Sequence, residues 1–224
     1  DDTLIDLKYL RKLMIADNKI HNLTSLVHNL PPFLRVLDIS RNPIKKISMQ
    51  DLIPIRKLEE LIIYDVKITK PDTFLKLHNL KILKISSQHN FSDIVSKLHG
   101  LREIFLSVNE HRLNSAYFGK LLTNTKLNFI EITGRKLRSI EDTAFQGLIR
   151  NDNLKIQIRK TMITDLPANL FYVLRHMPKL SIDIVDNKLS RLSQHVFYPN
   201  ISAWDAVGTR SIMGGINIGI GNNL

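Results

Sequence analysis

Short segments in which apolar and polar residues alternate recur along the chain. In residues 34–44, Leu37 and Ile39 alternate with polar or smaller neighbours, and Asn42 follows where the alternation stops. This period of two is typical of a short strand with one buried face. Because the chain must turn after the strand, the Asn42 amide is expected to bond backbone groups that the bend leaves unpaired.

The same spacing occurs eight times, at intervals of 21–26 residues, with repeats that start at Leu10, Leu34, Leu58, Leu80, Leu101, Leu127, Asn153 and Lys179. It resembles the leucine-rich repeat, L-x-x-L-x-L-x-x-N-x-L, whose length is about 20–29 residues. One such unit cannot bury its own apolar face, so neighbouring repeats must stack. The resemblance implies an α/β repeat solenoid, a horseshoe with a parallel β-sheet on the concave face and loops or short helical turns on the convex face.

The second half of the repeats contains a second regular feature, a Phe in equivalent positions: Phe74, Phe118, Phe145, Phe171 and Phe197. Aromatic side chains in such a register predict a buried spine behind the strands. Four of the expected turn Asn residues are replaced, by Val66, Gln88, Arg135 and Thr161. The Asn ladder is therefore expected to be irregular at these repeats.

The domain prediction is one solenoid over residues 1–200, with about eight repeats from Leu10. Residues 201–224 include Trp204 and a Gly-rich piece, and they are interpreted as an irregular or ninth repeat, truncated before a C-terminal cap. A solenoid end without a cap exposes core and strand edges. We therefore expect the chain to be a fragment of a longer protein.

Two segments resemble one subclass of the repeat. Residues 137–148 are similar to the L-x-x-I-x-x-x-A-F-x-G-L tail of animal extracellular repeats, and residues 163–174 to the related L-x-x-L-P-x-x-x-F-x-x-L tail. This "typical" class occurs in Toll-like receptors, Slit, chaoptin-like adhesion proteins and small secreted proteoglycans. The resemblance implies a non-catalytic, protein-binding receptor or adhesion module that is extracellular, secreted or at the cell surface.

Cysteine is absent, and this fits two locations. A cytoplasmic leucine-rich repeat scaffold or adaptor would lack disulfides, and so would the interior of an extracellular array whose disulfides lie in its end caps. No apolar run of about 18 residues occurs, so membrane contact would require segments outside this chain. The net charge of +11 suggests an acidic partner, an anionic polysaccharide or a membrane surface, although a Lys-rich solvated surface is the simpler explanation and is favoured.

Catalytic and cofactor signals are weak. The eight His residues are scattered without ligand spacing, no nucleophile elbow is present, and the glycine-rich piece lacks the phosphate-binding spacing. Glu131 and Asp183 occupy equivalent positions two strands apart, about 9.6 Å, near the upper limit for an inverting glycosidase pair. Chance placement explains this pair, so no enzyme, metal or cofactor is predicted.

Three sequons, at Asn22, Asn90 and Asn200, are candidate glycosylation sites. Chance alone accounts for about two such motifs in a chain of this composition, so they support secretion only weakly.

The candidate protein-binding surface lies on the concave face, where side chains at repeat positions 3, 5 and 7 point away from the core. Five apolar side chains are expected to cluster there: Ile62, Tyr64, Ile82, Phe105 and Phe129. Aromatic residues with charged neighbours suit a protein-binding hot spot, for a separate protein ligand or for homophilic association. The alternatives are cover by a loop and ordinary β-propensity.

A second candidate surface is basic and lies at the turns of the sixth and seventh repeats: Arg135, Lys136, Arg138, Lys155, Arg159 and Lys160. It is a candidate patch for a sulfated glycan or an acidic protein, with a solvated face as the alternative. Nucleic acid is not expected, because no base-stacking aromatic residues lie among these basic residues.

Overall fold

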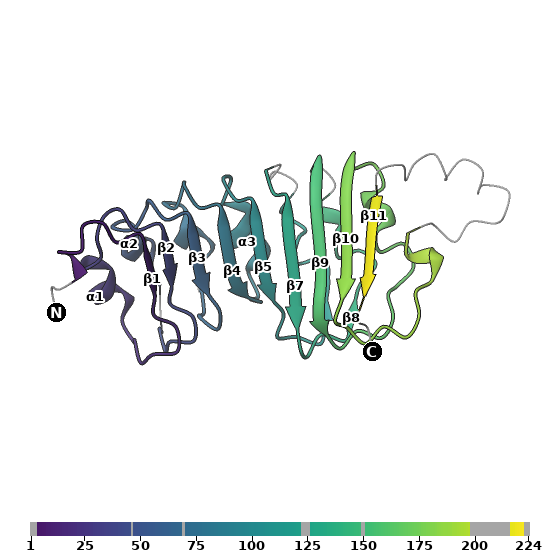
Figure 1. Cartoon of the computed structure of the whole chain (residues 1–224), viewed down its shortest axis with the longest axis horizontal. Helices are drawn as coiled ribbons and strands as arrows, with labels where there is room; N and C mark the ends of the chain where they lie inside the picture. The colour runs from purple at the N-terminus through teal and green to yellow at the C-terminus, as the bar shows by residue number, and fades with distance from the viewer. Residues whose placement is uncertain are drawn as a thin grey trace. The chain divides into compact units, whose positions relative to one another are not determined.

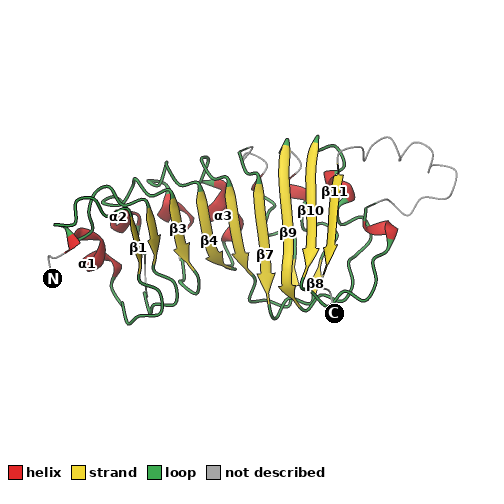
Figure 2. Cartoon of the chain, viewed as in Figure 1, coloured by secondary structure: helices red, strands yellow, loops and turns green. Residues whose placement is uncertain are grey.

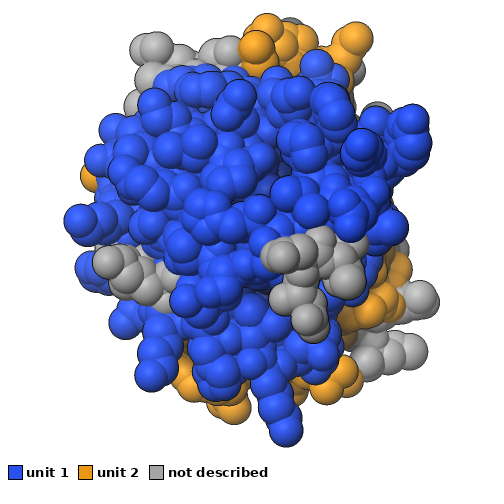
Figure 3. All heavy atoms as spheres, turned by 90° about the vertical axis from the view of Figure 1, so that its left-hand side faces the viewer, with its two compact units in different colours: residues 1–105 blue, residues 106–224 orange. Residues whose placement is uncertain are grey.

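The computed structural model describes residues 4–45, 47–68, 70–121, 126–148, 151–197 and 216–221. The chain divides into two compact units, residues 1–105 and 106–224 (Figure 3). The predicted region of irregular sequence, residues 201–215, and the glycosylation candidate Asn200 lie outside the described residues.

The sheet of the first unit is built from one strand per repeat (Figure 1). Its strands are β1 (Lys12–Met14), β2 (Val36–Asp38), β3 (Glu60–Ile63), β4 (Ile82–Ser86) and β5 (Glu103–Ser107), in chain order. The pairs β1–β2, β2–β3 and β3–β4 are parallel, and the position-4 leucines Leu13, Leu37, Leu61 and Leu83 lie in register. The repeat spacing thus becomes a ladder of equivalent residues.

Short helices cover one face of this sheet (Figure 2). They are α1 (Leu23–His28), α2 (Met49–Leu52), η2 (Pro71–Phe74) and α3 (Phe91–Ser96). Their apolar side chains, such as Val27, Phe74 and Ile94, are fully buried. The other face of the sheet, which we call the open sheet face, carries the side chains of repeat positions 3, 5 and 7.

The second unit repeats this arrangement. Its sheet contains β7 (Phe129–Gly134), β9 (Asn153–Thr161), β10 (Lys179–Val185) and β11 (Ile216–Gly221), in that order and all parallel. A smaller parallel pair joins β6 (Arg112–Leu113) to β8 (Ser139–Ile140). The 3-10 helices are η4 (Gln146–Leu148), η5 (Tyr172–Leu174) and η6 (Gln194–Val196). Strand β11 lies where an irregular or ninth repeat was expected.

A stack of Phe rings forms the back of the core in the second unit. The ring centroids of Phe118 and Phe145 are 5.9 Å apart, and the next two steps, to Phe171 and then Phe197, are 5.6 Å each. All four rings are buried, which confirms the predicted spine here. Gly147 is part of this packing, because a Cβ there would lie 1.6 Å from the Phe118 carbonyl oxygen.

The ladder of turn side chains is more complete than the sequence predicted. Asn42 donates to the Ile15 carbonyl (2.8 Å) and accepts from the Ile20 amide (3.1 Å). Gln88 does the same work in its repeat, since it accepts from the Ile68 amide (2.7 Å) and donates to the Val66 carbonyl (3.0 Å). The longer amide side chain thus accepts from the equivalent amide of the preceding repeat but donates to a different carbonyl of that repeat.

Thr161 also replaces an Asn without loss of bonding. Its hydroxyl donates to Asn187 Oδ1 over 2.7 Å, and the Ile163 amide donates to Thr161 Oγ1 over 3.3 Å. Arg135 differs, because its side chain is exposed. The ladder position of the sixth repeat thus presents a cation to solvent.

We expect Phe145→Ala to lower the free energy of unfolding by about 3–5 kcal/mol, because it opens a cavity between two stacked rings. Urea denaturation of the variant and of Met162→Ala measures this. Met162 is 43% exposed in the same unit, so its truncation should cost less than about 0.5 kcal/mol. Equal losses in the two variants would contradict the stacked spine.

Acid stability should depend on Asp51, which caps α2. Burial opposes its charge, but hydrogen bonds from Ser48 and from the Thr24 hydroxyl outweigh burial, so the pKa of Asp51 lies below its ordinary value. A carboxyl with a lowered folded-state pKa stabilises the fold above its unfolded pKa of about 3.9, and this stability is lost as the pH falls further.

Wild type should therefore lose more stability than Asp51→Asn between pH 6 and pH 3, measured by thermal unfolding across that range. The exposed Asp72 provides the control, and Asp72→Asn should follow the wild-type curve. Parallel curves for wild type and Asp51→Asn would show that this carboxylate does not carry the acid sensitivity.

Candidate functional site

The open sheet face of the first unit holds four of the five predicted apolar residues. Tyr64, Ile82 and Phe105 are half-buried, so each leaves part of its side chain accessible. Ile62 is only 6% exposed, and the prediction that it is accessible is wrong. It sits at the centre of the face between Asp38 on β2 and Lys84 on β4, where neighbours on both sides cover it.

Lys84 organises the charges on this face. Its Nζ lies 2.8 Å from Glu60 Oε1 and 4.9 Å from the centroid of the Phe105 ring. An ammonium over an aromatic ring is attracted by the negative ring face. The apolar side chains are therefore interspersed with an ion pair, as at protein-binding surfaces that combine aromatic anchors with polar neighbours.

Phe129 belongs to the second unit. It is half-buried on β7, where it is in register with Lys155 on β9. The predicted five-residue cluster is thus divided, with four residues in the first unit and one in the second. The part of the surface that the structure brings together is Ile62, Tyr64, Ile82 and Phe105.

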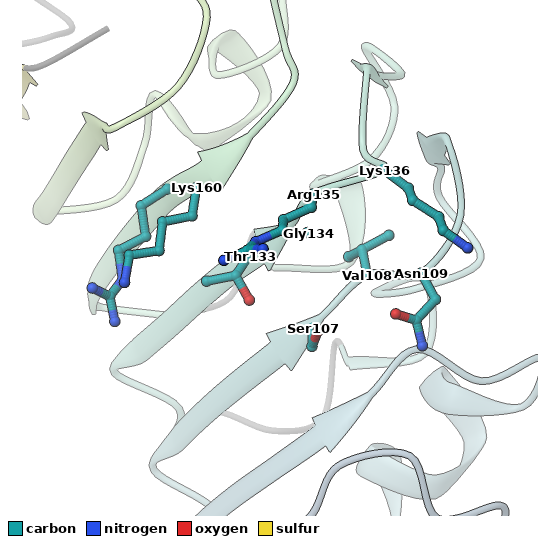
Figure 4. A pocket seen from close by; sticks show the side chains of 9 residues that line it. Ser107, Val108, Asn109, Thr133, Gly134, Arg135, Lys136 and Lys160 are labelled. Carbon is teal, nitrogen blue, oxygen red and sulfur yellow. The ribbon is translucent and has the colours of Figure 1, made fainter.

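A basic pocket of about 450 Å³ lies at the turns of the second unit (Figure 4). Four of the six predicted basic residues line it: Arg135, Lys136, Arg159 and Lys160. Arg138 does not line it, nor does Lys155, whose Nζ is 2.5 Å from Asp183 Oδ2. The sequence missed three polar lining residues, Ser107, Asn109 and Thr133, although all three follow or end a predicted strand.

A β-bulge positions Lys160. Thr133 is in register with Arg159, and Gly134 with Thr161, so Lys160 is the extra residue on β9. Its φ is 55°, in the left-handed region, and its amide donates to the Asp186 carbonyl over 3.0 Å. A bulge redirects a side chain at the end of a strand, and here it directs a Lys to the pocket.

Gly134 is required where β7 ends. A Cβ at this residue would lie 2.4 Å from the Val108 carbonyl oxygen, closer than two such atoms approach. The glycine therefore lets the two turns come together and close one side of the pocket.

The cations of the pocket are unequally neutralised. Arg159 Nε donates to Glu131 Oε2 over 2.7 Å, and Glu131 is buried. For Arg135, Lys136 and Lys160 no ion pair with a described residue is recorded, and all three are exposed. In Figure 4, Arg135 extends toward Lys160, whereas Lys136 extends toward Asn109.

The carboxylates considered for catalysis are in the predicted register, with Gln157 between Glu131 and Asp183. Each of them contacts a basic side chain on β9, Glu131 through Arg159 and Asp183 through Lys155. Neither therefore faces the other across a cleft. Within the described parts of the chain, no group of three or more His, Cys, Asp or Glu could hold a metal ion.

The two described sequons lie at helix starts on the face opposite the open sheet face. Asn22 is exposed and caps α1, with its Oδ1 accepting from the Thr24 amide over 2.9 Å. Asn90 is half-buried before α3 and makes no capping bond.

Comparison with known proteins agrees with this architecture. No family model matches the chain. Chaoptin of Tribolium castaneum is 27% identical over 196 residues, which are 83% of this chain and 25% of chaoptin. This chain thus spans about a quarter of the length of that relative.

Two solved structures share the fold. A chain of the Drosophila Toll–Spatzle complex aligns with a TM-score of 0.59 at 16% identity, over 97% of this chain and 28% of that chain. Human 5T4 (trophoblast glycoprotein) aligns with a TM-score of 0.60 at 16% identity, over 83% of this chain and 72% of that chain.

The chain has the fold of leucine-rich repeat proteins. The repeats of this leucine-rich repeat protein are of the extracellular type that the motifs at residues 137–148 and 163–174 indicated, and the predicted fold class is confirmed. Among the helices that the structure describes, none is long and apolar enough to cross a membrane.

The Arg159–Glu131 pair should couple energetically. We expect Arg159→Met to destabilise the protein by about 1–2 kcal/mol, because it leaves a buried carboxylate without its cation, with a reduction for partial solvent screening of Arg159. Glu131→Gln in the same chain should recover part of the loss, as a double-mutant cycle would measure. The exposed pair Arg191–Asp165 is the control, and its coupling should be much weaker than that of Arg159 with Glu131, because both of its groups are screened by solvent.

Proposed function

We propose that this leucine-rich repeat protein is a protein-binding module of an extracellular or cell-surface receptor or adhesion protein, and that it binds its partner through the open sheet face. The observation that carries the proposal is the half-buried group Tyr64, Ile82 and Phe105 on a face that no described helix covers. Apolar and aromatic side chains at the centre of a polar surface are typical of binding hot spots.

The relatives support the general part of the proposal. Leucine-rich repeat proteins act as protein-interaction modules, and one structural neighbour comes from the complex of Toll with Spatzle. A repeat array suits this work, because neighbouring repeats present equivalent side chains on one continuous surface.

The location outside the cell is supported by the repeat type and by the two described sequons. Asn22 and Asn90 both precede helices on the covered side of the sheet, so glycans there would leave the open sheet face free. The absence of Cys is the observation that favours the second candidate, a cytoplasmic leucine-rich repeat scaffold. That candidate would use the same face.

The partner is a separate protein or a second copy of this chain. Light scattering distinguishes a separate protein from a second copy. The solution mass is measured for wild type, Phe105→Asp and Leu75→Asp over a range of salt concentrations. Leu75 is 38% exposed and directly follows η2 on the covered side, so Leu75→Asp adds the same charge away from the open sheet face.

For homophilic association we expect wild type and Leu75→Asp to form dimers of similar affinity. Phe105→Asp should dimerise at least about tenfold more weakly, because its charge would be buried in an apolar contact. Salt should change the affinity little. A monomer in all three proteins would reject homophilic association and leave a separate ligand as the partner. A dimer that both substitutions weaken equally would contradict binding through the open sheet face.

A further inference from the structure

The basic pocket of the second unit has a composition that differs from the open sheet face. We infer that this pocket, formed by the turns that carry Arg135, Lys136 and Lys160, binds the sulfate groups of an extracellular sulfated polysaccharide. The choice of a polysaccharide rests on the extracellular location proposed above. None of the residues proposed to bind protein lines this pocket.

Positive charge is concentrated in this pocket. Three exposed cations line one pocket of about 450 Å³, and among the described residues no ion pair is recorded for any of them. Glu131 accepts a hydrogen bond from Arg159, the fourth basic residue of the lining. Like charges held close together repel one another, and a bound anion relieves that repulsion.

The backbone around the pocket departs from a regular strand end at two residues, Lys160 and Gly134. Lys160 occupies a bulge with left-handed φ, and Gly134 permits a close approach that any side chain would block. Arg135 stands where six of the other seven repeats place Asn, Gln or Thr in the ladder and the third repeat places Val66, and Arg135 is exposed. Arg135 replaces a hydrogen-bonding ladder side chain by an exposed cation. Such departures from the local pattern are expected at functional positions.

The chemistry of the lining selects the ligand class. Around the cations lie the polar residues Ser107, Asn109 and Thr133, which suit the hydroxyl groups of a sugar. The apolar side chain in the lining is Val108, which is 1% exposed. Since no aromatic side chain is among the lining residues, the pocket lacks the aromatic anchors of a protein-binding hot spot and the stacking platforms of a nucleic-acid site.

The spacing of the cations also suits a polymer. Arg135 follows β7 and Lys160 lies near the end of the adjacent strand β9, and adjacent strands are about 4.8 Å apart. A chain with sulfate groups at regular intervals can therefore contact several turns at once, with Arg135 able to bond a sulfate through two N–H groups.

The test uses heparin as the probe, with affinity measured by titration calorimetry at several salt concentrations. The pocket variant is the triple substitution Arg135→Gln, Lys136→Gln, Lys160→Gln. The matched control is Lys19→Gln, Lys67→Gln, Arg102→Gln. Lys19 and Lys67 occupy the same repeat position as Lys136, and all three control residues are exposed in the first unit.

We expect the pocket variant to lose about 10- to 100-fold in heparin affinity, since each cation near a polyanion contributes about tenfold or less. The slope of log affinity against log salt should fall by about two to three. The control, which loses the same charge, should change less than about threefold. Unchanged thermal unfolding of both variants verifies that they fold.

Three results would overturn the inference. An equal loss in the control would show that heparin senses only net charge, and absence of heparin binding by wild type would reject the site. Binding of polyglutamate as tight as that of heparin, lost in the pocket variant, would assign the pocket to an acidic protein segment. Phe105→Ala should bind heparin as wild type does, so failure here and failure of the proposed protein-binding face are distinguishable.

Discussion

The structure depends on one constraint, that a single repeat cannot bury its own apolar face. Each strand contributes two inward side chains, and these are covered only when equivalent residues of the next repeat stack on them. The position-4 leucines in register across β1–β4 and the stacked Phe rings of the second unit satisfy this constraint at the front and back of the core. Gly147 shows how closely neighbouring repeats pack beside the Phe stack, since no Cβ fits against the Phe118 carbonyl.

Stacking in one direction leaves two surfaces with no role in the core. The open sheet face carries the side chains that alternate with the buried ones, and the turn edge carries residues that end each strand. Ladder side chains such as Asn42 and Gln88 satisfy the buried backbone at that edge. Where Arg135 replaces the ladder side chain, the edge instead presents a cation beside Lys160. The apolar side chains of the open sheet face and the cations of the basic pocket thus occupy different positions of the repeat pattern.

The sequence predicted those features that repeat spacing determines. Strands, the Phe spine and the register of Glu131 with Asp183 follow from counting residues within each repeat. Features that depend on neighbours were not predictable in this way. Ile62 is buried because Asp38 and Lys84 flank it on adjacent strands, and Lys160 reaches the pocket through a bulge. Left-handed φ angles occur at one shared repeat position, at Asp17, Arg41, Asp65, Lys160 and Asp186. Asp is a residue type enriched in this region, but Arg41 and Lys160 give no such indication.

If the proposed function is correct, the protein partner contacts the open sheet face and not the helix-covered face. The most direct measurement places the photocrosslinking residue p-benzoylphenylalanine at Tyr64 in one sample and at Leu75 in another, and illuminates each on intact cells that express the protein. Both sites are accessible, and they lie on opposite faces of the first unit. We expect one covalent adduct of defined mass from position 64. Excess unlabelled wild-type protein should abolish this adduct, whereas excess unlabelled Phe105→Asp should leave it unchanged. An adduct from position 75 alone would contradict the proposed function.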